Sequence, residues 1–217
     1  MRIEDRDARA IFNLLSSMAM SERNMSNYRI FGQWVRATWA GWVLGIPLII
    51  ALALVGEAVG IGGAQVLVGA GMGMGIGLMQ GRAIRGVLHK SAPWFWSCTV
   101  GLAVPFLAAD IAKAAKWDFA YSLYVSVAFG GLIVGGWQAF LLRSRFRHTG
   151  WWVVASVVGW NLAAGMAAVA DPVSRSHSLR GIWGALAYLG IVTGGGLLLG
   201  LVTGVSLVWL LRHETAV

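Results

Sequence analysis

The sequence contains one cysteine and few charged residues, and each shortage excludes a class of protein. A single cysteine, Cys98, rules out an intrachain disulfide and with it a secreted, disulfide-stapled domain. Because Cys98 lies in an apolar run, we interpret it as a small buried hydrophobic residue. Charged residues make up 12% of the 217 residues, about half of the roughly 25% that is usual in soluble proteins. So few charges cannot cover a water-facing surface, which excludes a conventional soluble enzyme and a disordered chain.

Apolar residues and positive charge are what the chain has instead. Hydrophobic residues reach 58% and the mean hydropathy is +0.70, so we expect most of the surface to face lipid. Lys and Arg number 17 against 9 Asp and Glu, which gives a net charge of +8. These cations lie beside apolar stretches, where anionic lipid headgroups explain them better than nucleic acid does. We therefore expect membrane lipids, and no nucleic acid, among the partners.

Six apolar stretches are long enough to cross a bilayer, whose hydrocarbon core needs roughly 20 residues of helix. They are residues 34–56, 61–81, 93–115, 120–142, 151–171 and 182–211. The arm before them, residues 1–33, is polar and lacks the apolar core of a cleavable signal peptide, so the first span should act as an uncleaved insertion signal. Residues 4–19 carry apolar side chains on one helical face, which predicts an interfacial amphipathic helix on the cytoplasmic leaflet or against a partner. Residues 213–217 form a short tail.

The positions of Lys and Arg predict the orientation of the chain. Thirteen of the 17 lie in the arm, in the connections after the second and fourth spans, and in the tail. Cytoplasmic loops carry the excess of positive charge, so both termini should be cytoplasmic, in a bacterial inner membrane. Aromatic residues near the span ends predict two anchoring belts. The inner belt would contain Trp34, Trp39, Trp94, Trp96, Trp151, Trp152 and Trp209, and the outer belt Trp117, Phe119, Tyr121 and Trp183.

The spans contain an internal repeat. A shift of 58 residues aligns the second and third spans with the fourth and fifth without gaps. The matched pairs include Gln80 and Gln138, Arg85 and Arg143, and Trp94 and Trp152. The sixth span repeats the glycine pattern but has Leu207 where the others have glutamine. We therefore predict an all-α, polytopic bundle of six transmembrane helices over residues 34–212. It would consist of three parallel two-helix repeats, residues 28–85, 86–143 and 151–212.

Small residues recur at every fourth position of the spans and therefore share one helical face. Such faces let helices approach closely within lipid. The glycines expected at helix-packing positions are Gly69, Gly73, Gly77, Gly131, Gly135, Gly196, Gly200 and Gly204. Gln80 and Gln138 lie on the same faces, and Asn161 is the deepest polar residue of the fifth span. We interpret these three amides as interhelical hydrogen-bonding groups, with a ligand-facing role as the alternative.

Residues 131–160 combine Gly-x-x-x-Gly-x-x-Gln, Leu-Leu-Arg, a short basic loop, Trp-Trp and Gly-Trp. This pattern resembles the repeats of uncharacterised bacterial multi-spanning membrane proteins that carry a Q-W-L-x-L-R…WW…GW signature. The resemblance covers about half of the chain and implies no known activity. The earlier copy departs from the pattern, with Gly81-Arg82 in place of an apolar pair and Pro93-Trp94 in place of Trp-Trp.

Little in the sequence points to catalysis. No ionisable residue lies at mid-depth in a span, so the usual groups for proton-coupled transport are missing. Asp110 and Lys113 are spaced i, i+3, and we interpret them as a partly solvated pair at a helix end. The four histidines lie in loops or at span ends without the i, i+4 spacing of a helical metal site. We therefore predict no metal site and no catalytic residues. The weak candidates to hold a haem-type or chlorophyll-type ring are His89, His148 and His213.

These observations favour a non-enzymatic integral membrane scaffold or accessory subunit of a larger bacterial membrane complex, for example a respiratory or photosynthetic one. It would pack against other integral membrane proteins, lipids or apolar cofactors such as a quinone, carotenoid or chlorophyll-type pigment, none of which it requires. The outer loop 171–180 is either solvated or an anionic docking site formed by Arg175, His177 and Arg180. The alternative function is a small-molecule transporter or channel with a pseudo-threefold repeat. In that case Gln80, Gln138 and Asn161 would line a polar path.

Overall fold

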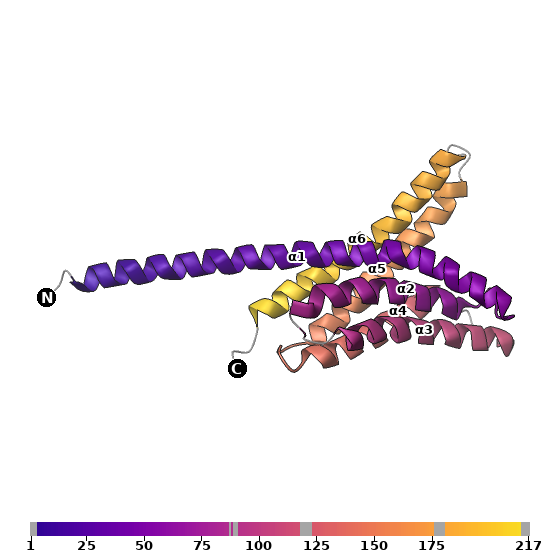
Figure 1. Cartoon of the computed structure of the whole chain (residues 1–217), viewed down its shortest axis with the longest axis horizontal. Coiled ribbons are helices and arrows are strands. Elements are labelled where there is room, and N and C mark those ends of the chain that lie inside the picture. The colour runs from indigo at the N-terminus through magenta and orange to yellow at the C-terminus, as the bar shows by residue number, and fades with distance from the viewer. Residues whose placement is uncertain (1–3, 87, 89–90, 118–122, 176–180, 214–217) are drawn as a thin grey trace.

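A computed structural model shows an all-helical protein (Figure 1). It describes residues 4–86, 88, 91–117, 123–175 and 181–213, with side chains for all of these except residues 4–24, 123 and 171–175. Within these ranges there are six α-helices, one short 3-10 helix and no strand. The elements are α1 (Glu4–Ala58), α2 (Gln65–Ala83), η1 (Ile84–Gly86), α3 (Ala92–Ala114), α4 (Leu123–Leu142), α5 (Gly150–Arg175) and α6 (Ile182–Arg212).

Five of these helices are long and apolar enough to cross a membrane. The spans run over Met25–Ala58, Ala92–Ala114, Tyr124–Leu142, Gly150–Ala170 and Ile182–Arg212. The predicted span at residues 61–81 does form a helix, α2, but it is not among the five apolar ones. Its sequence explains the difference, because glycine occupies positions 69, 71, 73, 75, 77 and 81, and Arg82 lies in its last turn. All six of these glycines are buried, so α2 is largely enclosed by its neighbours.

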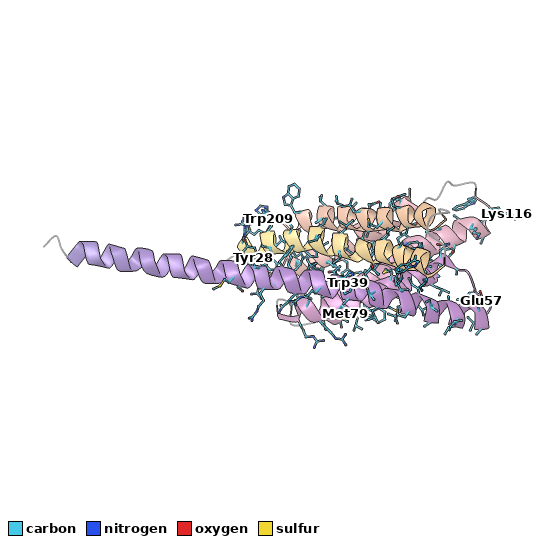
Figure 2. The ribbon with its side chains drawn as sticks, turned by 90° about the horizontal axis from the view of Figure 1, so that it is seen from above. Tyr28, Trp39, Glu57, Met79, Lys116 and Trp209 are labelled. Carbon is cyan, nitrogen blue, oxygen red and sulfur yellow. The ribbon has the colours of Figure 1, made fainter. Side chains whose placement is uncertain are left out.

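The helices form a closed ring. Each helix packs against the next one along the chain, and α6 packs against α1 to complete the circle. The ends of the bundle are distinguished in Figure 2, where Tyr28 and Trp209 lie toward one end and Glu57 and Lys116 toward the other. The end of α2, the start of α3, the α4–α5 connection and the end of α6 lie at one end of the bundle in Figure 1, the end marked by Trp209 in Figure 2. Alternate helices of a ring are not neighbours, so side chains that join them must fill its interior.

The residues predicted to form an interfacial helix are the first part of a much longer helix. Helix α1 runs without interruption from Glu4 into the first span and projects beyond the other helices (Figure 1). Its 55 residues make it roughly 80 Å long, well over twice the thickness of a bilayer core. The sequence explains this continuity, because the first glycine is Gly32 and the first proline is Pro47. Nothing before Gly32 therefore interrupts the helix.

At the opposite end, the last part of α5 and the first part of α6 diverge from α1–α4 (Figure 1). The first turns of α6 are exposed on most of their surface, including Ile182, Trp183 and Leu186. A Cβ added at Gly190 would meet no atom within 4 Å, whereas one at Gly196 would meet Trp42 of α1. The α5–α6 hairpin thus leaves the ring between Gly190 and Gly196.

Candidate functional site

Three tryptophans from alternate helices meet inside the ring. Trp34 of α1, Trp94 of α3 and Trp152 of α5 contact one another edge to face, with ring centroids 5.6–5.8 Å apart. All three side chains are at most 1% exposed. Edge-to-face pairs of this kind contribute about 0.5–1.5 kcal/mol each beyond the area they bury. The three indoles therefore close the interior of the ring at this level.

Each indole N–H has a hydrogen-bond acceptor on the neighbouring even-numbered helix. Trp94 Nε1 donates to Gln80 Oε1 of α2 at 3.2 Å, and Trp152 Nε1 donates to Gln138 Oε1 of α4 at 2.9 Å. Trp34 Nε1 donates to Thr203 Oγ1 of α6 at 2.9 Å. Thr203 lies one turn before Leu207, the residue that the predicted repeat aligns with the two glutamines. The hydroxyl thus supplies the acceptor that leucine cannot supply.

The glutamine amides are also bonded through their nitrogen atoms. Gln80 Nε2 donates to Thr38 Oγ1 of α1 at 3.0 Å, and Gln138 Nε2 donates to Cys98 Sγ of α3 at 3.2 Å. Gln80 and Gln138 are buried, and Cys98 is fully buried between them. We call the three indoles and these partners the tryptophan–glutamine cluster. It comprises Trp34, Thr38, Gln80, Trp94, Cys98, Gln138, Trp152 and Thr203.

The cluster corrects the predicted inner aromatic belt. Trp34, Trp94 and Trp152 lie in the interior because their N–H groups and rings are used there, so they cannot anchor the protein in lipid. Trp39, Trp96 and Trp151 are exposed, as an anchoring role requires. At the other end Trp117 and Trp183 are exposed as well, whereas Phe119 and Tyr121 fall outside the described residues.

The repeated glycines face the helix that follows in the ring. A Cβ added at Gly69, Gly73 or Gly77 of α2 would collide with α3 backbone atoms at Leu102, Cys98 and Phe95 respectively. On α4, a Cβ at Gly131 or Gly135 would lie 3.0–3.1 Å from an α5 Cα atom. On α6, a Cβ at Gly196, Gly200 or Gly204 would meet α1 within 2.5–3.1 Å. These eight glycines therefore lie in contacts between adjacent helices that leave no room for a side chain.

Asp110 has a role that its sequence neighbours do not indicate. Its carboxylate accepts hydrogen bonds from the backbone N–H groups of Gln65 and Val66, each at 2.8 Å. These are the first two residues of α2, whose own preceding residue, Ala64, offers no side-chain cap. Asp110 of α3 thus caps α2 from outside and favours its positive end. This contact replaces the predicted pairing of Asp110 with Lys113, which is exposed.

Asn161 does not join the cluster. Its Nδ2 donates to Val157 O of its own helix at 2.8 Å. The Nδ2 group therefore does not form the predicted hydrogen bond to another helix. Of the predicted docking loop, Arg175 is the last residue of α5, and His177 and Arg180 lie outside the described residues.

His89 also lies outside the described residues. His148, just before α5, and His213, just after α6, lie at the Tyr28 end, and both contact the Trp209 ring. Among the residues that the structure describes, no group of three His, Cys, Asp or Glu side chains is placed to hold a metal ion.

A sequence signal for part of the cluster does exist. Each of the three tryptophans is followed four residues later by a small polar residue, namely Thr38, Cys98 and Ser156. Two of these, Thr38 and Cys98, are the partners of the glutamine amides. No comparable signal identifies Thr203, because it lies four residues before Leu207, the position that aligns with the glutamines. In comparisons with known proteins, no protein-family model, no curated protein and no solved structure matches this chain.

Proposed function

We propose that this protein is a non-enzymatic scaffold or accessory subunit of a larger membrane complex, and that it works through its packing surfaces. The observation that carries the proposal is the tryptophan–glutamine cluster. Both side-chain functions of Gln80 and Gln138 are already bonded to protein groups, and the indoles occupy the interior of the ring. A transport path would need these amides free to face water or substrate. The cluster therefore supports a rigid core over a conducting one.

We also propose that the core is built from three parallel two-helix repeats, α1–α2, α3–α4 and α5–α6. Equivalent residues support this arrangement, since Trp34, Trp94 and Trp152 meet one another at nearly equal distances. The glycine faces of α2, α4 and α6 contact the first helix of the next unit in each case. About two helical turns after these tryptophans, the rings of Trp42 and Trp160 pack with their centroids 6.0 Å apart. The third equivalent residue is Leu102, which is also buried. The resemblance to uncharacterised bacterial proteins with such repeats belongs to the same proposal.

The outer surface supports partners in the membrane. Large apolar side chains are exposed on all six α-helices, with Val68 and Leu78 as the two on α2, and the α5–α6 hairpin extends away from the ring. A protruding apolar hairpin offers two sides to a neighbouring membrane protein or to an apolar cofactor. We place both termini and the arginine-rich connections on the cytoplasmic side of a bacterial inner membrane, from the distribution of Lys and Arg.

Mild extraction tests the proposal. The tagged protein, expressed from its own locus and solubilised in a gentle non-ionic detergent, should migrate with other membrane proteins and be seen with them by native mass spectrometry. A monodisperse monomer without any partner, pigment or quinone would contradict the proposal. In proteoliposomes, solute flux that Gln138→Leu abolishes would favour the transporter instead.

A further inference from the structure

A pocket lies at the arginine-rich end of the bundle and shares no lining residue with the tryptophan–glutamine cluster. It has a volume of about 300 Å³, opens to the surface, and is lined by His148, Gly150, Trp151 and Val154. This volume is at the lower end for ligand pockets. A Cβ added at Gly150 would meet nothing within 4 Å, so there is open space beside this lining residue. Trp151 and Val154 are 60% and 50% exposed and provide apolar walls.

The pocket straddles the boundary of a membrane span. Gly150 is the first residue of both α5 and its apolar span, and His148 lies just outside. Three of the four lining residues are therefore apolar residues or glycine at the edge of the hydrocarbon, and the fourth, His148, has a polar imidazole ring. A ligand that fits both parts has an apolar chain joined to an anionic group.

Positive charge is concentrated beside the pocket. The connection from α4 to α5, which leads into the pocket residue His148, contains Arg143 and Arg147, both exposed. Arginine binds phosphate through charge-assisted hydrogen bonds, and cations at this depth attract anionic headgroups.

His148 is held in an unusual backbone conformation beside these arginines. Its φ is +61°, in the left-handed region that residues other than glycine seldom adopt. Its ring contacts the edge of Trp209 at 6.2 Å, and His213 packs on the same indole at 4.4 Å. The end of α6 thus fixes the position of His148 at the rim of the pocket.

We infer that this pocket binds one anionic phospholipid. The start of an acyl chain would lie over Gly150 between Trp151 and Val154, and the phosphate would lie beside His148, Arg143 and Arg147. This inference goes beyond the proposed function. It depends only on the membrane spans and applies equally to a scaffold and to a transporter.

Native mass spectrometry of the delipidated full chain in non-ionic detergent, titrated with phosphatidylglycerol, tests the inference. The wild type should retain one phosphatidylglycerol, and Gly150→Leu should weaken that binding at least tenfold by filling the pocket. Gly136→Leu on α4 is the matched control, because a side chain there also meets nothing within 4 Å, and it should bind like the wild type. His148→Gln should weaken binding of phosphatidylglycerol as well. Equal thermal unfolding curves by circular dichroism would show that the variants are folded.

Three outcomes would overturn the inference. One is wild-type retention of phosphatidylglycerol by Gly150→Leu. Another is equal affinity for phosphatidylcholine, which carries no net charge and would show that the arginines do not select the headgroup. The last is displacement of the lipid by millimolar inorganic phosphate, which would show that a free anion and not a lipid is the ligand.

Discussion

Helices α4 and α6 use different residues to accept a tryptophan N–H, and mutation can convert the arrangement of α4 into that of α6. In α4, Gln138 accepts the Trp152 N–H, whereas in α6 Thr203 accepts the Trp34 N–H and Leu207 stands at the glutamine position. When Gly131 and Gly135 are aligned with Gly200 and Gly204, Val134 is the residue of α4 equivalent to Thr203. The variant with both Gln138→Leu and Val134→Thr therefore reproduces the α6 arrangement inside α4.

The expected energies follow from the contacts. Gln138→Leu alone leaves the buried Trp152 N–H without an acceptor, and such a loss costs about 1–3 kcal/mol. Hydrogen bonds between membrane helices average about 0.6 kcal/mol, so we expect a loss of about 1–2 kcal/mol in the free energy of unfolding. Val134→Thr alone should be nearly neutral, since its hydroxyl can donate to Gly130 O as Thr203 donates to Leu199 O at 2.6 Å. Together the two changes should recover about 1 kcal/mol or more of the loss.

Unfolding by SDS in mixed micelles, followed by far-UV circular dichroism, measures these free energies. The control pairs Gln138→Leu with Val127→Thr, which adds a hydroxyl to another buried position of α4. Val127 lies 11 residues from Gln138, too far to reach the Trp152 indole. If the double variant with Val134→Thr is as unstable as the sum of its single variants, then α4 and α6 are not equivalent and the repeat is wrong.

Two further variants test the contacts between helices. Gly73→Ala should destabilise the bundle by about 1–3 kcal/mol, because its Cβ would lie against Cys98 O and 2.7 Å from Thr99 Cα of α3. The control Gly136→Ala has open space around it and should be neutral or slightly stabilising. Equal unfolding free energies of the two variants would contradict close packing of α2 on α3. Asp110→Ala should lower the free energy of unfolding by about 0.5–2 kcal/mol and speed hydrogen exchange at the Gln65 and Val66 amides. The control Lys113→Ala should leave the exchange of these amides unchanged. Unaltered exchange in Asp110→Ala would show that the carboxylate does not cap α2.

The sequence predicted the helices better than their roles. Apolar length alone located five spans, because lipid requires about 20 apolar residues per crossing. The same rule placed α2 among the spans, although its glycines lower its hydropathy below that of the other five. Those glycines lie where α2 meets α1 and α3, and packing of this kind has no signature in hydropathy.

The candidate site shows where single-residue reasoning failed. Gln80 and Gln138 were identifiable because they are rare polar residues at matched positions in apolar spans. Their partners were not, since tryptophans near a span end fit an anchoring belt as well as a core. Which of the two occurs depends on the rotation of each helix in the ring. The Asp110 cap was missed for a similar reason, because its partners lie 44 and 45 residues away in sequence.

The native cysteine gives the most direct test of a closed, dry core. Cys98 is the only cysteine of the chain, and it lies fully buried between the two glutamines. We predict that N-ethylmaleimide and a charged methanethiosulfonate leave the folded protein unmodified in vesicles and label it fully after unfolding in SDS. A Cys98→Ser, Ser144→Cys variant, with its thiol in the exposed α4–α5 connection, is the positive control. Rapid modification of Cys98 in the folded protein would reveal water at the cluster and would contradict the account in favour of conduction.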